Sequence, residues 1–236
     1  MANINRINGF SPISSVTGLP WAAPGRKYAI PISDTTASYA IGDIVQSATS
    51  SGSTVGCDPQ GFPYVQKLTA GTGVVPLGII VGVEVADPST SLQGASLLLE
   101  NTFILAGTRT AVRYVYVCDD PNILFMGFIG SAGVTLATLR KNSAIGSYYS
   151  SADQTYAVNQ NATVTTLLSP NSPYSNLVLV SNASTATLPI QMLGLYLSPD
   201  NSATAVAAAG AYTRVVCKWN YHEFGLPSTA SNFVAP

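Results

Sequence analysis

The stretch that decides the fold is Val112-Arg-Tyr-Val-Tyr-Val-Cys118, followed by Asp119-Asp-Pro-Asn122 and then by Ile123-Leu-Phe-Met-Gly-Phe-Ile129. In the first run, β-branched and aromatic residues alternate, which is typical of a β-strand. The tetrapeptide between the two runs contains residues that favour β-turns, and the second run is again apolar. We therefore predict two strands that form a hairpin.

The same pattern continues on both sides of this segment. Short strands separated by Gly, Pro, Ser and Asn are predicted at residues 27–32, 39–46, 62–68, 74–86, 97–105, 176–180, 189–197 and 214–222. Asp58-Pro-Gln-Gly61 has the residues of a type I turn, and Gly78 and Gly82 indicate bulges in a curved strand. No useful helical period occurs, so the prediction is an all-β protein. We expect a small β-barrel or β-sandwich, β-tulip-like, with an additional β lobe.

Residues 1–26 differ from the rest in composition. They are rich in Asn, Ser, Pro and Gly, and their apolar residues follow no sustained period. Such a segment cannot build a core alone, so we interpret it as an N-terminal arm that lies on its own subunit or on a neighbour. We expect that deletion of residues 1–20 leaves a folded β protein. Residues 27–236 form the mostly β body, with a division into two lobes at about 27–130 and 131–236 as one option.

Charge is scarce in this chain. Only 9% of the 236 residues are charged, against about 25% in ordinary domains, and Lys+Arg 10 nearly balances Asp+Glu 11. A free monomer needs more charge to stay dissolved, so we expect a homo-oligomer or larger assembly. The basic residues form no cluster, which argues against nucleic acid as a partner. Every apolar run is too short or too interrupted to span a membrane, and the start shows no signal peptide, which predicts synthesis in a cytoplasm.

The sequence contains few residues of the types that act in catalysis. His222 is the single histidine, so any histidine-dependent triad must include it, and a hydrogen-bonded strand histidine is the simpler interpretation. Asp119 and Asp120 are adjacent, but Pro121 and Asn122 follow them, which favours a capped turn over an acid pair. We predict no catalytic residue, no metal site and no cofactor.

The chain has three cysteines, which lie far apart in the sequence: Cys57, Cys118 and Cys217. An odd number in an apparently cytoplasmic chain favours reduced thiols. We expect all of them to be small buried hydrophobic residues.

Several segments together resemble a known family, the head decoration (capsid cement) proteins of tailed bacteriophages. These segments are Asn8-Gly-Phe-Ser-Pro-Ile13, Thr17-Gly-Leu-Pro-Trp21, Lys27-Tyr-Ala-Ile-Pro-Ile-Ser-Asp34, Tyr39-Ala-Ile-Gly-Asp-Ile-Val45, Leu77-Gly-Ile-Ile-Val-Gly-Val83, residues 110–122 and Cys217-Lys-Trp-Asn-Tyr-His-Glu-Phe-Gly225. Their order and spacing carry the resemblance, while residues 131–175 match poorly.

The resemblance implies a mostly β protein on the outer surface of the virion. Its partners would be the major capsid protein and other copies of itself, with a trimer favoured over a dimer. It would cement neighbouring capsomers and would have no enzyme activity. The N-terminal arm would then supply the contact to the capsid or to neighbouring subunits, with Ile4, Ile7, Phe10 and Trp21 as apolar anchors.

Two other classes stay open. A head-fibre or tail receptor-binding protein that recognises host surface glycans would also suit a tyrosine-rich β protein, and it predicts a concave aromatic patch with nearby carboxylates. A virion-associated glycan hydrolase would need two carboxylates that face each other about 5–10 Å apart.

Overall fold

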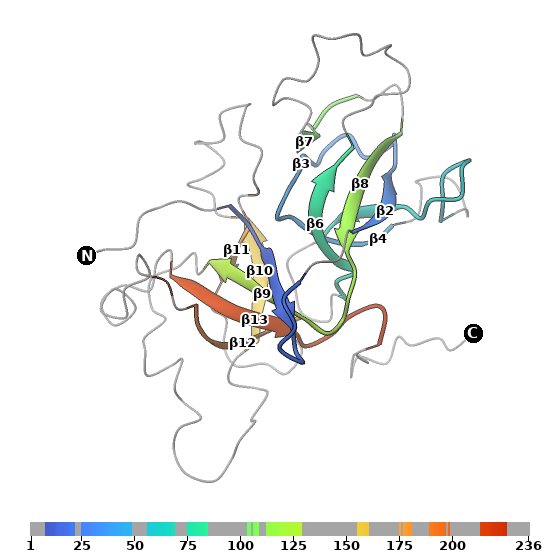
Figure 1. Cartoon of the computed structure of the whole chain (residues 1–236). Helices are drawn as coiled ribbons and strands as arrows, with labels where there is room; N and C mark the ends of the chain where they lie inside the picture. Colours follow the sequence, from blue (N-terminus) through green and yellow to red (C-terminus); the bar gives the residue numbers. More distant parts are fainter. Residues whose placement is uncertain are drawn as a thin grey trace, which may run out of the picture.

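The protein is all-β. The computed structural model describes residues 8–21, 25–48, 56–68, 75–84, 103–104, 106–108, 112–128, 155–160, 175, 177–180, 189–196, 198 and 213–225. Within these residues there is no helix, and thirteen strands form three antiparallel sheets. In the described part none of the sheets closes into a barrel (Figure 1).

The largest sheet has six strands and draws on both ends of the chain. Its order is β1-β9-β13-β12-β10-β11, with all neighbours antiparallel. The bounds are β1 Ser11–Ser15, β9 Ile123–Phe128, β13 Arg214–Trp219, β12 Ile190–Leu195, β10 Thr155–Gln160 and β11 Leu177–Val180. Because β1 and β9 precede residue 130 and the other four strands follow it, this sheet does not divide at that residue.

The second sheet has five strands in the order β2-β8-β6-β4-β5, and β3 pairs with β7 as a third, small sheet. The bounds are β2 Arg26–Ile30, β8 Arg113–Cys118, β6 Gly78–Val83, β4 Ile44–Ser47, β5 Val65–Lys67, β3 Tyr39–Ala40 and β7 Phe103–Ile104. The β6–β8 register shifts between Ile80 and Gly82, so the prediction of an irregularity at Gly82 is confirmed. The predicted single strand 39–46 is instead two strands, β3 and β4.

The predicted hairpin at residues 112–129 is wrong. β8 pairs with β2 and β6 in one sheet, whereas β9 pairs with β1 and β13 in the other. Each of these strands has both edges filled by distant partners, so neither has an edge left for the other. The residues between them carry the chain from one sheet to the next, and there the Asp119 carboxylate accepts a hydrogen bond from the Tyr28 hydroxyl (2.7 Å).

The core joins the two larger sheets. One buried cluster combines side chains of the six-stranded sheet, among them Phe125 and Trp219, with Ile44 and Ile79 of the five-stranded sheet. A second cluster covers the other face of the five-stranded sheet and includes Tyr39 beside β7. The middle of the five-stranded sheet is therefore buried on both faces: Ile44 and Ile79 belong to the first cluster, and their neighbours Val45 and Ile80 belong to the second.

The described part of the N-terminal segment belongs to this core. Gly9 and Gly42 have φ values of 69° and 91°, and a Cβ atom on Gly9 would lie 2.5 Å from the Gly42 carbonyl oxygen. The Phe10 amide donates a hydrogen bond to that same oxygen (2.9 Å). The close backbone contact needs glycine at both positions. From there β1 runs along β9, so residues 8–21 lie on their own subunit, which is one of the two options that the sequence left open.

Candidate functional site

The four predicted interface residues divide into two groups. Ile4 and Ile7 lie outside the described residues. Phe10 is 1% exposed and packs edge-on against the Phe125 ring, with 5.9 Å between the ring centroids, and Trp21 packs against the same cluster. Phe10 is therefore a core residue of its own subunit, and the partly buried Trp21 packs against the same core.

The chain between these two aromatic residues forms an exposed hairpin tip that the sequence analysis did not single out. We call residues 16–19 the 16–19 tip; it extends from the end of β1 (Figure 1, dark blue). Val16 is 55% exposed and Leu19 is 68% exposed, the two highest values among the exposed large hydrophobic residues in the described part. The turn residue Gly18 beside an apolar neighbour was the available signal in the sequence.

Backbone hydrogen bonds fix the shape of the tip. The Ser15 amide donates to the Leu19 carbonyl (2.8 Å), and the Gly18 amide donates to the Ser15 carbonyl (2.9 Å). The Val16 amide donates to the Asn122 carbonyl (2.8 Å), which ties the tip to the crossing between the sheets. Gly18 has a φ of 89°, the conformation that lets the turn close. The two apolar side chains are therefore presented on a preorganised loop.

The carboxylates of the described residues are all engaged inside the molecule. Three of them form ion pairs, Asp119 with Arg26 (3.3 Å), Glu84 with Lys27 (2.9 Å) and Asp43 with Lys67 (3.0 Å). The Asp120 carboxylate accepts from the Asn122 amide (2.8 Å), so the prediction of a capped turn at 119–122 is confirmed. Asp34 accepts from the Tyr39 hydroxyl, and Glu223 accepts from the Ser47 hydroxyl.

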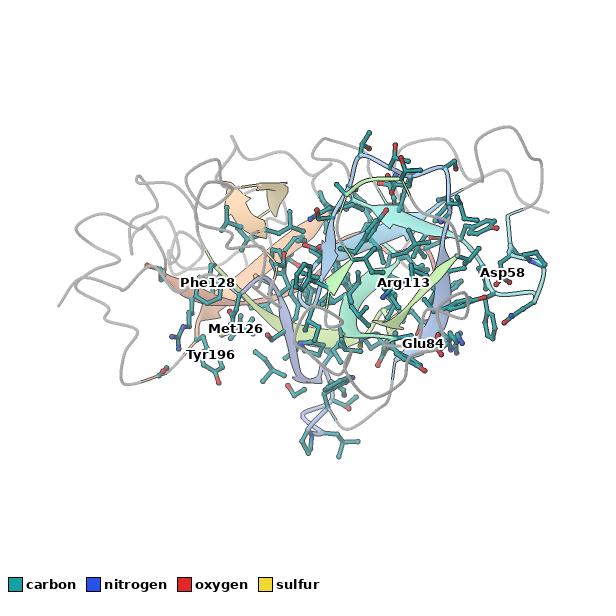
Figure 2. All side chains as sticks on the ribbon, turned by 90° about the horizontal axis from the view of Figure 1, so that it is seen from above. Asp58, Glu84, Arg113, Met126, Phe128 and Tyr196 are labelled. Atoms are coloured by element: carbon teal, nitrogen blue, oxygen red, sulfur yellow. The ribbon has the colours of Figure 1, made fainter. Side chains whose placement is uncertain are left out.

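The buried Asp58 carboxylate accepts hydrogen bonds from three donors. Its carboxylate accepts hydrogen bonds from the Gln60 and Phe62 amides (3.0 and 2.7 Å), which confirms the predicted turn at 58–61. It also accepts from the Tyr114 hydroxyl (2.7 Å), and burial together with this bond raises the pKa of Tyr114 to about 12. Figure 2 shows Asp58 at the far side of the molecule from Met126 and Phe128.

His222 is buried beside Trp219, with 5.6 Å between the ring centroids. Its Nδ1 accepts a hydrogen bond from the Phe224 amide (3.1 Å), which confirms a hydrogen-bonded histidine. Burial lowers the pKa of His222 to about 4, against weaker opposing effects of the Leu77 backbone and of Asp119 and Asp120. The imidazole is therefore neutral near pH 7.

The three cysteine thiols differ in how deeply they are buried. Cys118 and Cys217 are buried, and burial raises the pKa of both. Cys57 is only partly buried, so the prediction that all three are buried is wrong for this residue. All three are free thiols, as predicted.

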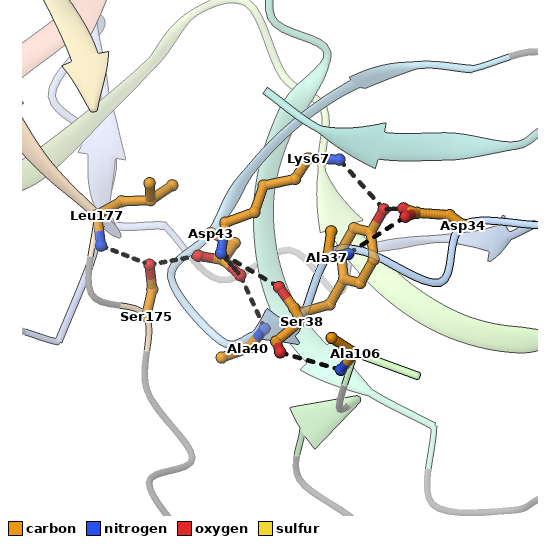
Figure 3. Close-up of polar contacts among 10 residues, drawn as sticks. Asp34, Ala37, Ser38, Ala40, Asp43, Lys67, Ala106, Ser175 and Leu177 are labelled. Atoms are coloured by element: carbon orange, nitrogen blue, oxygen red, sulfur yellow. Dashed lines mark hydrogen bonds and ion pairs between the residues drawn. The ribbon is translucent and has the colours of Figure 1, made fainter. Parts of the chain in front are cut away.

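A second candidate site is a buried polar cluster between the sheets, formed by Asp43, Lys67 and Ser175 (Figure 3). The Asp43 side chain is 0% exposed and the Lys67 side chain 13% exposed. The Ser175 hydroxyl and the Ala40 amide both donate to the Asp43 carboxylate, the latter at 2.9 Å. The Lys67 ammonium also donates to the Ser38 carbonyl (3.2 Å). These residues are too far apart in the sequence for any motif to have revealed them.

The described part of the chain shows neither a metal-binding cluster nor a membrane-spanning helix. There, no group of three His, Cys, Asp or Glu side chains is arranged to hold a metal ion. No helix in that part is long and apolar enough to cross a membrane.

Comparison of this chain with family models, with curated proteins and with solved structures finds no match.

Proposed function

We propose that this protein is a head decoration protein of a tailed bacteriophage, which binds the outer surface of the major capsid lattice and cements neighbouring capsomers. The proposal includes a homo-oligomer, with a trimer favoured, located on the virion after synthesis in the host cytoplasm. It also includes the β-tulip-like or barrel-like body that the sequence resemblance implies.

The observation that carries the proposal is the preorganised 16–19 tip. Exposed Val16 and Leu19 on a hydrogen-bonded loop are suited to insertion into an apolar pocket of another protein. The segment on which the tip stands, residues 8–21, also contains two of the sequence motifs that resemble decoration proteins. We therefore move the proposed anchors from Phe10 and Trp21 to Val16 and Leu19.

The mechanism of cementing would be physical. A decoration protein that touches two or three capsomers at once raises the effective concentration of each further contact, so the contacts add up to high avidity. Low surface charge favours such close packing, because there are few charged groups to desolvate. The internal pairing of the described carboxylates supports this proposal.

The test is binding to capsids assembled without this protein. We expect the double variant Val16→Ser with Leu19→Ser to bind about 100-fold more weakly than the wild type, because two apolar anchors are removed. The matched control is Ile32→Ser, which changes an exposed apolar residue in a different turn and should bind normally. Normal binding by the double variant would refute the tip as the attachment site.

The glycan-binding alternative has no specific observation in its favour. Its predicted patch needs carboxylates that are free to accept hydrogen bonds from sugar hydroxyls. Among the described residues each carboxylate already has a partner within the protein.

A further inference from the structure

The Asp43–Lys67 pair has an unusual combination of features for an ion pair. The Lys67 Nζ lies 3.0 Å from the Asp43 Oδ2, and the carboxylate is fully buried. Asp43 comes just before β4 and Lys67 ends β5, and these strands are neighbours with Val45 opposite Lys67. An amine and a carboxyl group that are held together out of water have a high effective concentration for reaction with each other.

The surroundings supply the polar contacts that amide formation requires. Both oxygens of the Asp43 carboxylate already have donors, the Ser175 hydroxyl on Oδ1 and the Ala40 amide on Oδ2. Fixed donors of this kind stabilise the negative charge that develops on oxygen when a nucleophile attacks the carboxyl carbon. The Ser38 carbonyl lies 3.2 Å from Nζ and can accept the single N–H that an amide would retain.

We propose that Lys67 and Asp43 condense to form an intramolecular isopeptide bond. This inference rests on the buried pair alone and does not depend on the proposed function. It makes Lys67 and Asp43 a covalent modification site and ties the β5 edge of the five-stranded sheet to the start of β4.

The reaction is balanced without any added reagent. The Lys67 ammonium first passes one proton to Oδ2 of Asp43, which gives an amine and a carboxylic acid. The amine lone pair attacks Cγ, so an Nζ–Cγ bond forms while the carbon–oxygen double bond opens toward Oδ1. Nitrogen then passes a second proton to Oδ2, the Cγ–Oδ2 bond breaks, and one water molecule leaves. The amide keeps Oδ1 as its carbonyl, against the Ser175 hydroxyl, and one N–H, toward the Ser38 carbonyl.

Mass spectrometry of the purified full chain tests the proposal. We expect the denatured wild type to be lighter than its sequence mass by about 18 Da, the mass of one water. Trypsin cannot cleave after an acylated lysine, and Lys67 is the single trypsin site between Lys27 and Arg109. The denatured wild type should therefore yield one peptide of residues 28–109 that lacks one water, with fragment ions that place the link at residues 43 and 67.

The matched control is Lys67→Arg, which keeps the positive charge but does not form this amide. Its mass should equal its own sequence mass, and trypsin should cleave it after residue 67. Three results would overturn the proposal: a wild type of full sequence mass, efficient cleavage of the wild type after Lys67, or the same mass deficit in the variant. Each would mean that no amide bond joins Lys67 to Asp43.

Discussion

The imidazole of His222 lies in a buried environment where its charged form is unfavourable. The ring is buried against Trp219, and its Nδ1 accepts the Phe224 amide, so the neutral form is the one that the fold accommodates. The pKa falls from the ordinary value of 6.5 to about 4, chiefly because of burial. The carboxylates of Asp119 and Asp120 oppose this shift without cancelling it.

This pKa predicts a loss of stability in acid. Below about pH 6.5 the unfolded chain binds a proton at His222 that the folded chain does not bind until about pH 4. The contribution to stability is therefore complete above pH 6.5 and is lost progressively as the pH falls toward 4, up to about 3 kcal/mol. Urea unfolding of the wild type at pH 7 and at pH 4.5 measures this loss.

The control is His222→Asn, which keeps an acceptor close to the position of Nδ1 but does not titrate. All other titratable groups are the same in both proteins, so the difference between wild type and variant isolates the histidine. An identical pH dependence in the two proteins would show that His222 is not the group responsible.

At the scale of elements, β1 is the strand whose role differs most from expectation. The sequence predicts an arm that can be removed, yet β1 pairs along β9 and Phe10 fills the core beside Gly127, where a Cβ atom would lie 2.5 Å from the Phe10 ring. Deletion of this segment would remove an edge strand and a buried aromatic residue together. We therefore no longer expect a truncated chain to fold normally.

Phe10→Ala tests this reassignment. Loss of a buried phenylalanine leaves a cavity, so we expect the free energy of unfolding to fall by about 3–5 kcal/mol, measured by urea denaturation. The matched control is Val16→Ala on the same segment, whose side chain is 55% exposed and which should change stability by less than about 0.5 kcal/mol. Equal stability of Phe10→Ala and wild type would restore the picture of a detached arm.

Sequence patterns predicted strands better than they predicted partners. Alternation around Tyr114 and Tyr116 identifies β8 because side-chain direction is a local property with a period of two. Pairing of β8 with β2 and of β9 with β13 depends on contacts across long stretches of chain, and no local signal distinguishes this arrangement from a hairpin.

The candidate sites were predictable only in part, for the same reason. Phe10 and Trp21 were predicted as apolar anchors for a partner, whereas the structure packs both against the protein's own core, because the surface that an apolar side chain covers is decided by tertiary contacts. Asp43 and Lys67 meet Ser175 only because the start of β4, the end of β5 and the segment before β11 converge, so no local sequence pattern could predict this cluster.

For the whole molecule, the distribution of charge is the property that bears most directly on assembly. The chain has few charged residues, and in the described part many of them neutralise one another or cap turns. Copies of such a molecule therefore repel one another only weakly. High local density on a particle is then less costly than it would be for an ordinary, strongly charged domain.

This reasoning predicts the number of copies on the particle. If the protein decorates the capsid lattice, its sites repeat with the lattice, so quantitative mass spectrometry of purified virions should find it in an amount comparable to the major capsid protein. A receptor-binding fibre or tail protein occupies a small number of positions, so the same measurement would then find a few copies per virion. The major capsid protein is the internal standard, and a known tail protein is the low-copy control. A protein that contacts several capsomers at once holds them together. The capsids of virions that lack the protein should therefore disassemble at a lower temperature than those of complete virions. A low copy number would exclude the cementing role and favour the fibre alternative, whatever the result of the tip variants.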